Sequence, residues 1–377
     1  MRPPRITYVS NLRQQLAGGG PYAVNWHAFD QLSRRFDARY AGPLGNLPLW
    51  VEPTVSEIRR RASEGHRHFD FLSAASLEQN AAEVARHTRD ADAIMFRSAT
   101  QWSRSRPSVK YFVYLDVAFH TFFFNTFRIE DFSRDDLERI WREEAAFLEG
   151  ASGVFFDSRW GMQKALGAYG LKGDHYFAPG RGGVIQPPSA DTWSGASRKL
   201  ISVAVNFWQK GGDRTLAAFR ELKPQYPALS WHIVGGEPQA GWESVNGVTY
   251  EGTLRPDVPE ERSRLQALLA DAFLLVHPTR EDTSPLVLTE AAYFGCPAVS
   301  VNLFGIPEFV EHGKTGVLLE PPVTSHAVAA TIAGLLDDPD RYLAMRKHAR
   351  ETALEKYSWN RVGAAICDQI ERTLTAD

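Results

Sequence analysis

The segment from Leu274 to Val310 constrains the fold of this chain most, because it joins two strand signals through a loop and a short helix. Residues 274–276 end an apolar run, which is typical of a strand buried on both faces of a sheet. A polar loop follows at 279–284. Pro285 suits the first turn of a helix, where its missing N–H costs nothing. The apolar residues 298–301 then predict a second strand, giving the strand–helix–strand order of an α/β protein.

Two carboxylates bracket this unit: Asp282 in the loop and Glu290 in the helix, with seven residues between them. The helical turns between them span roughly 8 to 12 Å, about the reach of a sugar and part of a nucleotide. A carboxylate accepts hydrogen bonds from neighbouring hydroxyls, and free N–H groups in the first turn of the helix favour an anion in the loop. A solvated loop acid and a surface ion pair would explain the same residues without a ligand.

The same segment resembles the signature of the retaining, GT-B-type glycosyltransferases of family 4, also called glycosyl transferases group 1. Pro278 and Thr279 open the signature, and Asp282 stands where the family usually has its first glutamate. Glu290 matches the second glutamate, and residues 305–308 match the family's "GIPE" residue for residue. Residues 312–316 are similar to its "NGxTG" turn, with histidine in place of asparagine.

This resemblance implies an α/β fold of two Rossmann-like domains that face each other across a cleft. The length of 377 residues independently favours two domains. We expect an acceptor-side domain over 1–185 and a nucleotide-sugar-binding domain over 190–357. The C-terminal helix, 358–377, would return to the first domain.

Composition limits the partners and the compartment. A formal net charge of −3 gives no general case for nucleic acid. Two cysteines fit a reducing compartment, and no apolar run approaches the ~20 residues that span a bilayer. We expect a cytoplasmic protein with, at most, peripheral membrane contact. Local basic density is more readily explained by solvated surface than by an acidic acceptor or a lipid headgroup; it comes from Arg59, Arg60, Arg61, Arg67, Arg104 and Arg106.

A glycine-rich loop follows the first predicted strand, residues 6–10. Gly18, Gly19 and Gly20 let the backbone approach a ligand closely, and the resemblance implies that this loop faces the donor. Gly18, Gly20 and Ala23 also satisfy the dinucleotide pattern G-x-G-x-x-A, although the loop lies some distance after the strand. Strand and helix signals then alternate over 38–40, 55–62, 69–72, 77–87 and 93–96, which predicts a mostly parallel sheet.

The strand predicted at 111–116 ends in Asp116, at the position where open α/β sheets place ligand groups. One subgroup of family 4 has "Y-x-D-x-T" here, with Ala118 replacing its threonine in this chain. His120 could act as a general acid or base or bind a sugar hydroxyl, and a packed histidine is an equal alternative. The aromatic run at 119–124 suits the core or an acceptor platform.

In the second half, the loop at 206–212 is similar to the family's "G-x-D-F-x-R-K-G-G". Lys210 takes the place of its lysine, a compact charge suited to a diphosphate. Gln209 replaces the family's arginine, so Arg181 or Arg280 could supply the missing cation. The loop after the strand at 248–253 would contact the nucleobase through its backbone.

The resemblance therefore implies transfer of a sugar, with retention, from a UDP- or GDP-sugar to a saccharide, lipid-linked or small-molecule acceptor in polysaccharide or glycoconjugate biosynthesis. Glu290 would bind the ribose, Lys210 the diphosphate, and Asp282 the transferred sugar. No metal and no other cofactor are expected. The expected catalytic residues are Asp282, His120 and Asp116, and the expected donor-binding residues are Gly18, Gly19, Gly20, Lys210, Gly252, Arg280, Thr283, Ser284, Pro285, Leu286, Val287 and Glu290.

Three alternatives stay open. A nucleotide-sugar epimerase or a phosphorylase of similar fold would need no acceptor or only free phosphate. An NAD-dependent oxidoreductase would use the glycine pattern that begins at Gly18. A binding protein that has lost turnover would account for the replacements at Ala204, Gln209 and Asp282. A phosphate loop of the ATP-binding type is excluded, because Glu308 stands where that motif needs glycine.

Overall fold

The computed structural model describes residues 2–15, 20–45, 67–238, 241–242 and 244–376. The chain divides into two compact units. Unit 1 comprises Met1–Gln15, Pro21–Arg181 and Trp359–Asp377, and unit 2 comprises Leu16–Gly20 and Gly182–Ser358. The C-terminal helix α13 (Trp359–Thr375) thus belongs to unit 1, as the fold prediction required.

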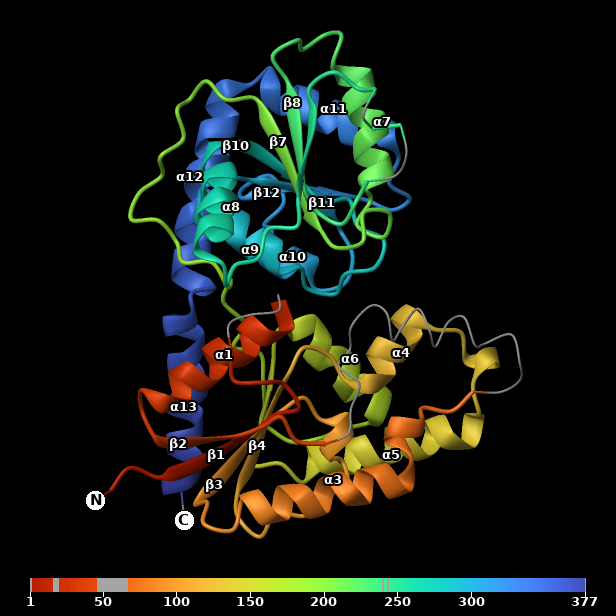
Figure 1. Ribbon diagram of the computed structural model, residues 1–377, viewed down its shortest axis with the longest axis vertical. Helices are drawn as coiled ribbons and strands as arrows, with labels where there is room; N and C mark the ends of the chain where they lie inside the picture. The colour runs from red at the N-terminus through yellow and green to blue at the C-terminus, as the bar shows by residue number, and fades with distance from the viewer. Residues whose placement is uncertain (1, 16–19, 46–66, 239–240, 243, 377) are drawn as a thin grey trace. The chain divides into compact units, whose positions relative to one another are not determined.

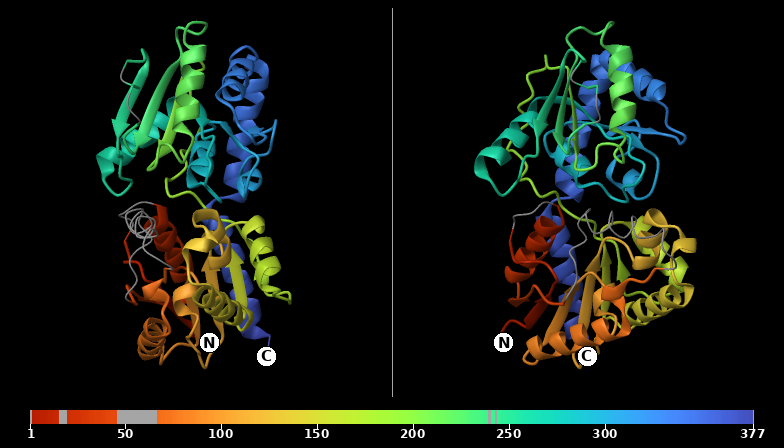
Figure 2. Two further views of the ribbon diagram at one scale, coloured as in Figure 1. Left: turned by 90° about the vertical axis from the view of Figure 1, so that its right-hand side faces the viewer. Right: turned by 45° about the vertical axis from the view of Figure 1, so that its right-hand side comes forward.

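Unit 1 is built on a sheet of six parallel strands (Figures 1 and 2). Chain order reverses between its second and third positions, so the carboxyl ends of β1 and β3 flank a topological switch point, where such sheets bind ligands. In sheet order the strands are β2 (Asp37–Ala41), β1 (Arg5–Val9), β3 (Ala93–Arg97), β4 (Tyr111–Leu115), β5 (Gly153–Phe156) and β6 (Tyr176–Phe177).

Helices cover both faces of this sheet (Figure 1). On one face α1 packs against α13, where Gly363 lies against Gln31. On the other face residues of α3, α5 and α6 join the strands in one apolar cluster. The helices of unit 1, besides α13, are α1 (Gly20–Ser33), α3 (Ala74–His87), α4 (Phe119–Thr126), α5 (Arg134–Glu149) and α6 (Arg159–Tyr169).

One predicted strand in unit 1 is wrong. Residues 69–72 stand in a strand position of the expected alternation, but Asp70–Leu72 form a 3-10 helix. Phe69 stacks on Phe132 with ring centroids 4.8 Å apart, so the apolar run fills a separate aromatic core. The helix expected at 55–62 lies outside the described residues.

Unit 2 carries a second sheet of six parallel strands, drawn from green to blue in Figure 1. Its order is that of a dinucleotide-binding Rossmann sheet, and chain order reverses between β7 and β10. The strands are β12 (Gly316–Leu319), β11 (Ala298–Val301), β10 (Ala272–Val276), β7 (Lys199–Ala204), β8 (Ser230–Gly235) and β9 (Val248–Gly252).

Helices again lie on both faces, with α7 against α11 on one side and α9 against α12 on the other (Figure 1). A single apolar core of buried residues from strands and helices holds the layers together. The prediction of two Rossmann-like α/β domains is confirmed. The helices are α7 (Gly212–Leu222), α8 (Pro259–Asp271), α9 (Leu286–Tyr293), α10 (Ile306–Phe309), α11 (Ser325–Leu336) and α12 (Pro339–Lys356).

The described residues contain neither a membrane-spanning helix nor a metal-binding group of side chains. No helix in this part of the chain is both long and apolar enough to cross a membrane. The same residues contain no group of three or more His, Cys, Asp or Glu side chains arranged to hold a metal ion. The basic density of the sequence is partly neutralised, since Arg104 forms ion pairs with Glu78 and Glu143. Arg59, Arg60 and Arg61 lie outside the described residues.

Candidate functional site

Two loops meet at the switch point of unit 2: the loop after β7 and the loop after β10. The backbone N–H of Arg280 donates to Gln209 O at 2.8 Å, and Thr279 Oγ1 donates to the same oxygen at 3.2 Å. Gly211 has φ +78°, and a Cβ there would come within 2.1 Å of Pro278 O. Only glycine allows this approach, so the glycine after Lys210 is what lets the two loops touch.

Lys210 and Asp282, which have separate expected roles, form one ion pair. Lys210 Nζ lies 2.7 Å from Asp282 Oδ2 and also donates to Glu281 O at 3.1 Å. His277 Nε2 lies 3.3 Å from the same carboxylate oxygen. Burial by itself raises the pKa of Asp282, but the charge of Lys210 and the hydrogen bond from His277 outweigh it and hold that pKa below its ordinary value. Asp282 is therefore ionised at neutral pH.

This cluster keeps hydrogen-bonding capacity for a ligand. An ammonium group has three N–H donors, and Lys210 uses two of them within the described residues. Among the same residues Asp282 Oδ2 is engaged, whereas Oδ1 accepts no hydrogen bond. The side chains of Lys210 and Asp282 are 23% and 20% exposed, so both can be reached. The site can offer a cationic donor to an anionic oxygen and an acceptor to a hydroxyl.

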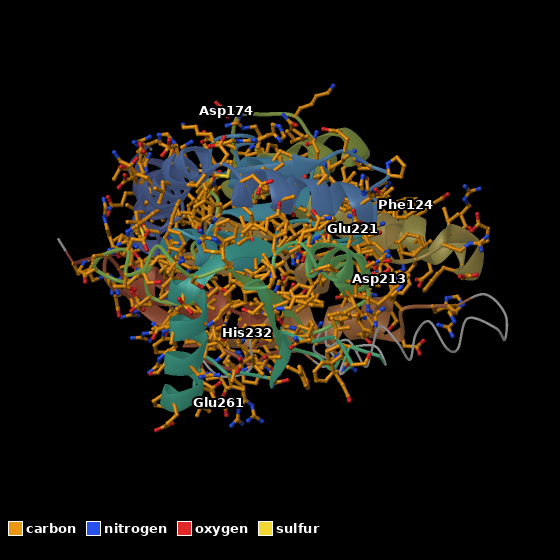
Figure 3. The ribbon with its side chains drawn as sticks, turned by 90° about the horizontal axis from the view of Figure 1, so that it is seen from above. Phe124, Asp174, Asp213, Glu221, His232 and Glu261 are labelled. Carbon is orange, nitrogen blue, oxygen red and sulfur yellow. The ribbon has the colours of Figure 1, made fainter. Side chains whose placement is uncertain are left out.

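Arg280, expected as a substitute cation for the diphosphate, has a different set of contacts. Its guanidinium makes two hydrogen bonds of 2.7 Å to Asp213, which Figure 3 labels at the start of α7. It also lies over the ring of Trp208, 4.3 Å from the centroid, and Nη1 donates to Trp208 O at 2.6 Å. Burial raises the pKa of Asp213, and the bond to Arg280 more than reverses this and lowers it. The positive charge of Arg280 is therefore paired with Asp213, and its guanidinium holds the ring of Trp208 in place.

The predicted donor loop leads directly into α9. Pro285 is the N-cap residue rather than the first helical residue, and it supplies no side-chain cap. The N–H groups of the first turn are thus uncapped by side chains, and Ser284 beside them is buried. Thr283 O accepts a hydrogen bond from Gly305 N at 2.9 Å, which ties this loop to the "GIPE" segment.

Glu290, the predicted ribose ligand, projects from the second turn of α9 and is 7% exposed. Its Oε1 accepts a hydrogen bond from Val184 N at 3.0 Å. A Cβ at Gly183 would lie 2.9 Å from Glu290 Cγ, so the backbone of 183–184 runs close along this side chain. The ribose role stays a prediction.

In unit 1 Asp116 and His120 follow the carboxyl end of β4. Asp116 is exposed, and its Oδ1 accepts a hydrogen bond from Val117 N at 2.8 Å. The ring of His120, on α4, lies among aromatic rings, with centroids 4.7 Å from Phe124 and 5.0 Å from Trp141. Burial lowers the pKa of His120, which favours its neutral form. A neutral imidazole can accept a proton or a hydrogen bond from a hydroxyl.

The residue that anchors the start of α4 was not predicted from the sequence. Glu144, on α5, is buried, and its carboxylate accepts hydrogen bonds from Thr100 Oγ1 (2.7 Å), Phe119 N (2.8 Å) and Tyr169 OH (2.5 Å). Burial raises the pKa of Glu144, partly offset by these bonds. Tyr169 OH in turn accepts from His120 N at 3.1 Å. One buried carboxylate thus links α4 and α6 at the turn that carries His120.

Comparison with known proteins bears on unit 2 first. Residues 190–352 match the family model of glycosyl transferases group 1. The matched residues make up most of unit 2. The chain is 30% identical over 169 residues to the GDP-mannose-dependent alpha-(1-6)-phosphatidylinositol monomannoside mannosyltransferase of Mycolicibacterium smegmatis, covering 42% of this chain and 44% of that protein. It is 28% identical over 191 residues to glycogen synthase of Mycobacterium tuberculosis, covering 47% and 44%. The chain therefore spans under half of these relatives.

Solved structures resemble the chain over its whole length. Sucrose-phosphate synthase from Thermosynechococcus elongatus has a TM-score of 0.71 at 16% identity, with 100% of both chains covered. Anabaena HepE, solved in complex with UDP and glucose, has a TM-score of 0.64 at 16% identity and covers 98% of this chain and 99% of its own. At such identities the likeness establishes the fold, which matches the GT-B architecture of glycosyltransferases.

Within unit 2, Lys210 and Asp282 come together, and His277 joins them without having been predicted. Its signal was its position directly after β10, where ligand groups gather. Gly252 ends β9 with φ +75°, and a Cβ there would meet nothing within 4 Å, so its glycine serves the turn. Gly20 is the first residue of α1. Gly18 and Gly19 lie outside the described residues.

Proposed function

We propose that this protein transfers a sugar from a UDP- or GDP-sugar to a saccharide, lipid-linked or small-molecule acceptor, with retention at the anomeric carbon. The observation that carries the proposal is the Lys210–Asp282–His277 cluster at the switch point of a group 1 glycosyltransferase domain. GDP-mannose in the name of one relative and UDP in the HepE structure support these two nucleotides.

The donor side follows from the hydrogen-bonding capacity of the cluster. The third N–H of Lys210 and the uncapped first turn of α9 would stabilise the negative charge that grows on the departing diphosphate. Asp282 Oδ1 would accept from a hydroxyl of the transferred sugar. Because Lys210 holds Asp282 ionised, this acceptor stays available at neutral pH. Glu290 would hold the ribose. We assign no covalent nucleophile.

The acceptor side belongs to unit 1. Asp116 is exposed at the carboxyl end of β4, and His120 presents an imidazole whose neutral form is favoured by burial. These groups would orient the attacking hydroxyl and receive its hydrogen bond. Glu144 would act as a positioning residue, because it fixes the turn that carries His120 without touching the substrate.

A thermal-shift screen against UDP, GDP, ADP and their sugar conjugates tests the proposal. A ligand present at a hundred times its Kd stabilises the folded state by about 2.7 kcal/mol. We expect UDP or GDP compounds to raise the unfolding temperature and ADP compounds to have no effect. Failure of all of them to bind the wild-type protein would contradict the proposed function.

Glu290→Gln tests the ribose assignment, because it keeps the volume of the side chain but removes its charge. We expect the nucleotide-induced shift to fall sharply, since a neutral amide oxygen is a weaker acceptor for ribose hydroxyls. Glu260→Gln, at an exposed position on α8, is the matched control and should respond as the wild type does. A normal shift in Glu290→Gln would rule out the assignment.

A further inference from the structure

Trp208 is a large aromatic side chain that the fold leaves 47% exposed beside the charged cluster of unit 2. It lies in the loop between β7 and α7, two residues before Lys210, and Val205 in the same loop is 75% exposed. Most large apolar side chains in the described residues are buried. An exposed tryptophan next to polar groups is typical of a surface that binds a ligand with one apolar face.

The ring of Trp208 is held in place before any ligand binds. Arg280 lies over the ring at 4.3 Å and is itself fixed by two 2.7 Å hydrogen bonds to Asp213. The backbone at Trp208 and at the next residue is tied to the loop after β10, because Arg280 Nη1 donates to Trp208 O and Arg280 N donates to Gln209 O. One side of the ring therefore has a fixed cation against it, and the exposed remainder is preorganised for a second partner.

The position of Trp208 after β7 indicates whether its ligand is a sugar or a nucleobase. The sequence analysis predicts the nucleobase near Gly252, at the end of β9, which is two strands away from β7. Neighbouring strands are about 4.8 Å apart, so the two strand ends are separated by about 10 Å. The transferred sugar is attached directly to the diphosphate that Lys210 would contact. Trp208 is thus on the sugar side of Lys210.

We propose that Trp208 is a binding residue that stacks on the C–H face of a pyranose ring, either the transferred sugar or the sugar of the acceptor. This inference rests on the proposed function. The competing explanation is structural: Trp208 would only cover Arg280 and stabilise the junction of the two loops. The two explanations differ in what a non-aromatic residue of similar bulk does to sugar binding.

The test compares wild type, Trp208→Phe and Trp208→Leu by calorimetric titration with UDP, GDP, UDP-glucose and GDP-mannose, and with a panel of methyl glycosides and disaccharides. For Trp208→Leu we expect unchanged affinity for the free nucleotide and about 2- to 12-fold weaker binding of sugar-containing ligands, which corresponds to an aromatic contact of about 0.5–1.5 kcal/mol. Trp208→Phe should recover most of the loss. If only the sugar nucleotides bind more weakly, Trp208 contacts the transferred sugar. If only the glycosides bind more weakly, Trp208 contacts the sugar of the acceptor.

The control is Trp160→Leu, on α6 in unit 1, where a partly exposed tryptophan also faces a cation, Lys164, at 5.8 Å. It should leave every titration unchanged. Equal loss for free UDP or GDP would place a nucleobase on Trp208 and overturn the proposal. Unchanged sugar binding in Trp208→Leu, with or without a lower unfolding temperature, would also overturn it. If wild type binds no nucleotide at all, the proposed function fails, and the glycoside titrations still test Trp208.

Discussion

The switch points of the two sheets each carry a cation at or near a strand end, but the two cations differ in how accessible they are. In unit 2 Lys210 and Asp282 are 2.7 Å apart, and both keep about a fifth of their side-chain surface exposed. In unit 1 Arg97 ends β3 and is 8% exposed, and Asp157, one residue past β5, is 1% exposed. Arg97 Nη1 donates to Tyr114 O at 3.0 Å, and its guanidinium lies 5.1 Å from the centroid of that ring.

This difference separates a charge kept for a ligand from a charge used within the fold. An accessible ammonium can exchange a water for a phosphate oxygen at little cost to the folded state. A desolvated guanidinium bound to the backbone of the next strand contributes to holding the sheet together, because removing it takes one donor from a buried carbonyl and one positive charge from the surroundings of a buried carboxylate. Substitution in unit 2 should therefore affect activity more than stability, and substitution of Arg97 should do the reverse.

The largest effect is expected from Lys210→Met. It removes the donor for the departing diphosphate, and losses of about 100- to 1,000-fold in kcat are usual for one such group. The unfolding temperature should change little, because the pair is partly exposed. Steady-state kinetics and calorimetry on the same preparation check both statements. Lys347→Met, at a side chain that is 73% exposed, is the control. If Lys210→Met lowers the unfolding temperature but leaves kcat unchanged, the contrast between the two units is contradicted.

A smaller effect, on stability, is expected from Arg97→Met. We expect a loss of about 1 to 3 kcal/mol in the free energy of unfolding, because among the described residues Tyr114 O keeps only the bond from Ser98 N and the buried Asp157 keeps only Arg181, at 3.5 Å, as a nearby cation. Urea denaturation measures it, with Arg128→Met as the control, since Arg128 is 81% exposed. If Arg97→Met unfolds like wild type but transfers sugar poorly, both switch points serve the ligand.

Local patterns in the sequence were sufficient for most of the fold. The strand 298–301 has the bounds that were predicted, because a run of small and apolar residues directly after Pro297 marks it locally. The strand predicted at 69–72 was wrong for a physical reason. Phe69 packs in an aromatic core with Phe132, and burial of this kind does not require a strand.

The site was predictable residue by residue but not as an arrangement. Lys210 and Asp282 are 72 positions apart, and they meet only because β7 and β10 are neighbours in the sheet. The same neighbourhood puts Arg280 over Trp208, so the loop tryptophan gains its importance from a contact that no local pattern contains. The role of Glu144 was unpredictable for the same reason. Its place on an amphipathic helix does not indicate the three hydrogen-bond donors that surround its carboxylate in the fold.

The smallest expected effect is a dependence on pH. It should differ between the two units, because Asp282 in unit 2 stays charged over the range in which His120 in unit 1 changes its charge. Lys210 keeps the pKa of Asp282 below its usual range, so that carboxylate does not titrate between pH 5 and 7.5. Burial lowers the pKa of His120 in the folded state below about 6.5, the value of an unperturbed imidazole. The unfolded chain then binds a proton more readily than the folded one. The contribution of His120 to stability is therefore complete above pH 6.5 and is lost as the pH falls through the folded pKa.

The corresponding measurement is the acidic limb of kcat, together with urea denaturation, from pH 7.5 to 5. We expect wild type to lose rate with a midpoint below 6.5, and His120→Gln to lose this limb along with most of its activity, because the pKa of Tyr169 beside it is raised far above this range. His277→Gln is the comparison in unit 2, since His277 contacts Asp282. If the limb vanishes in His277→Gln and persists in His120→Gln, acid sensitivity belongs to the donor side, and the neutral imidazole of unit 1 has no part in the reaction.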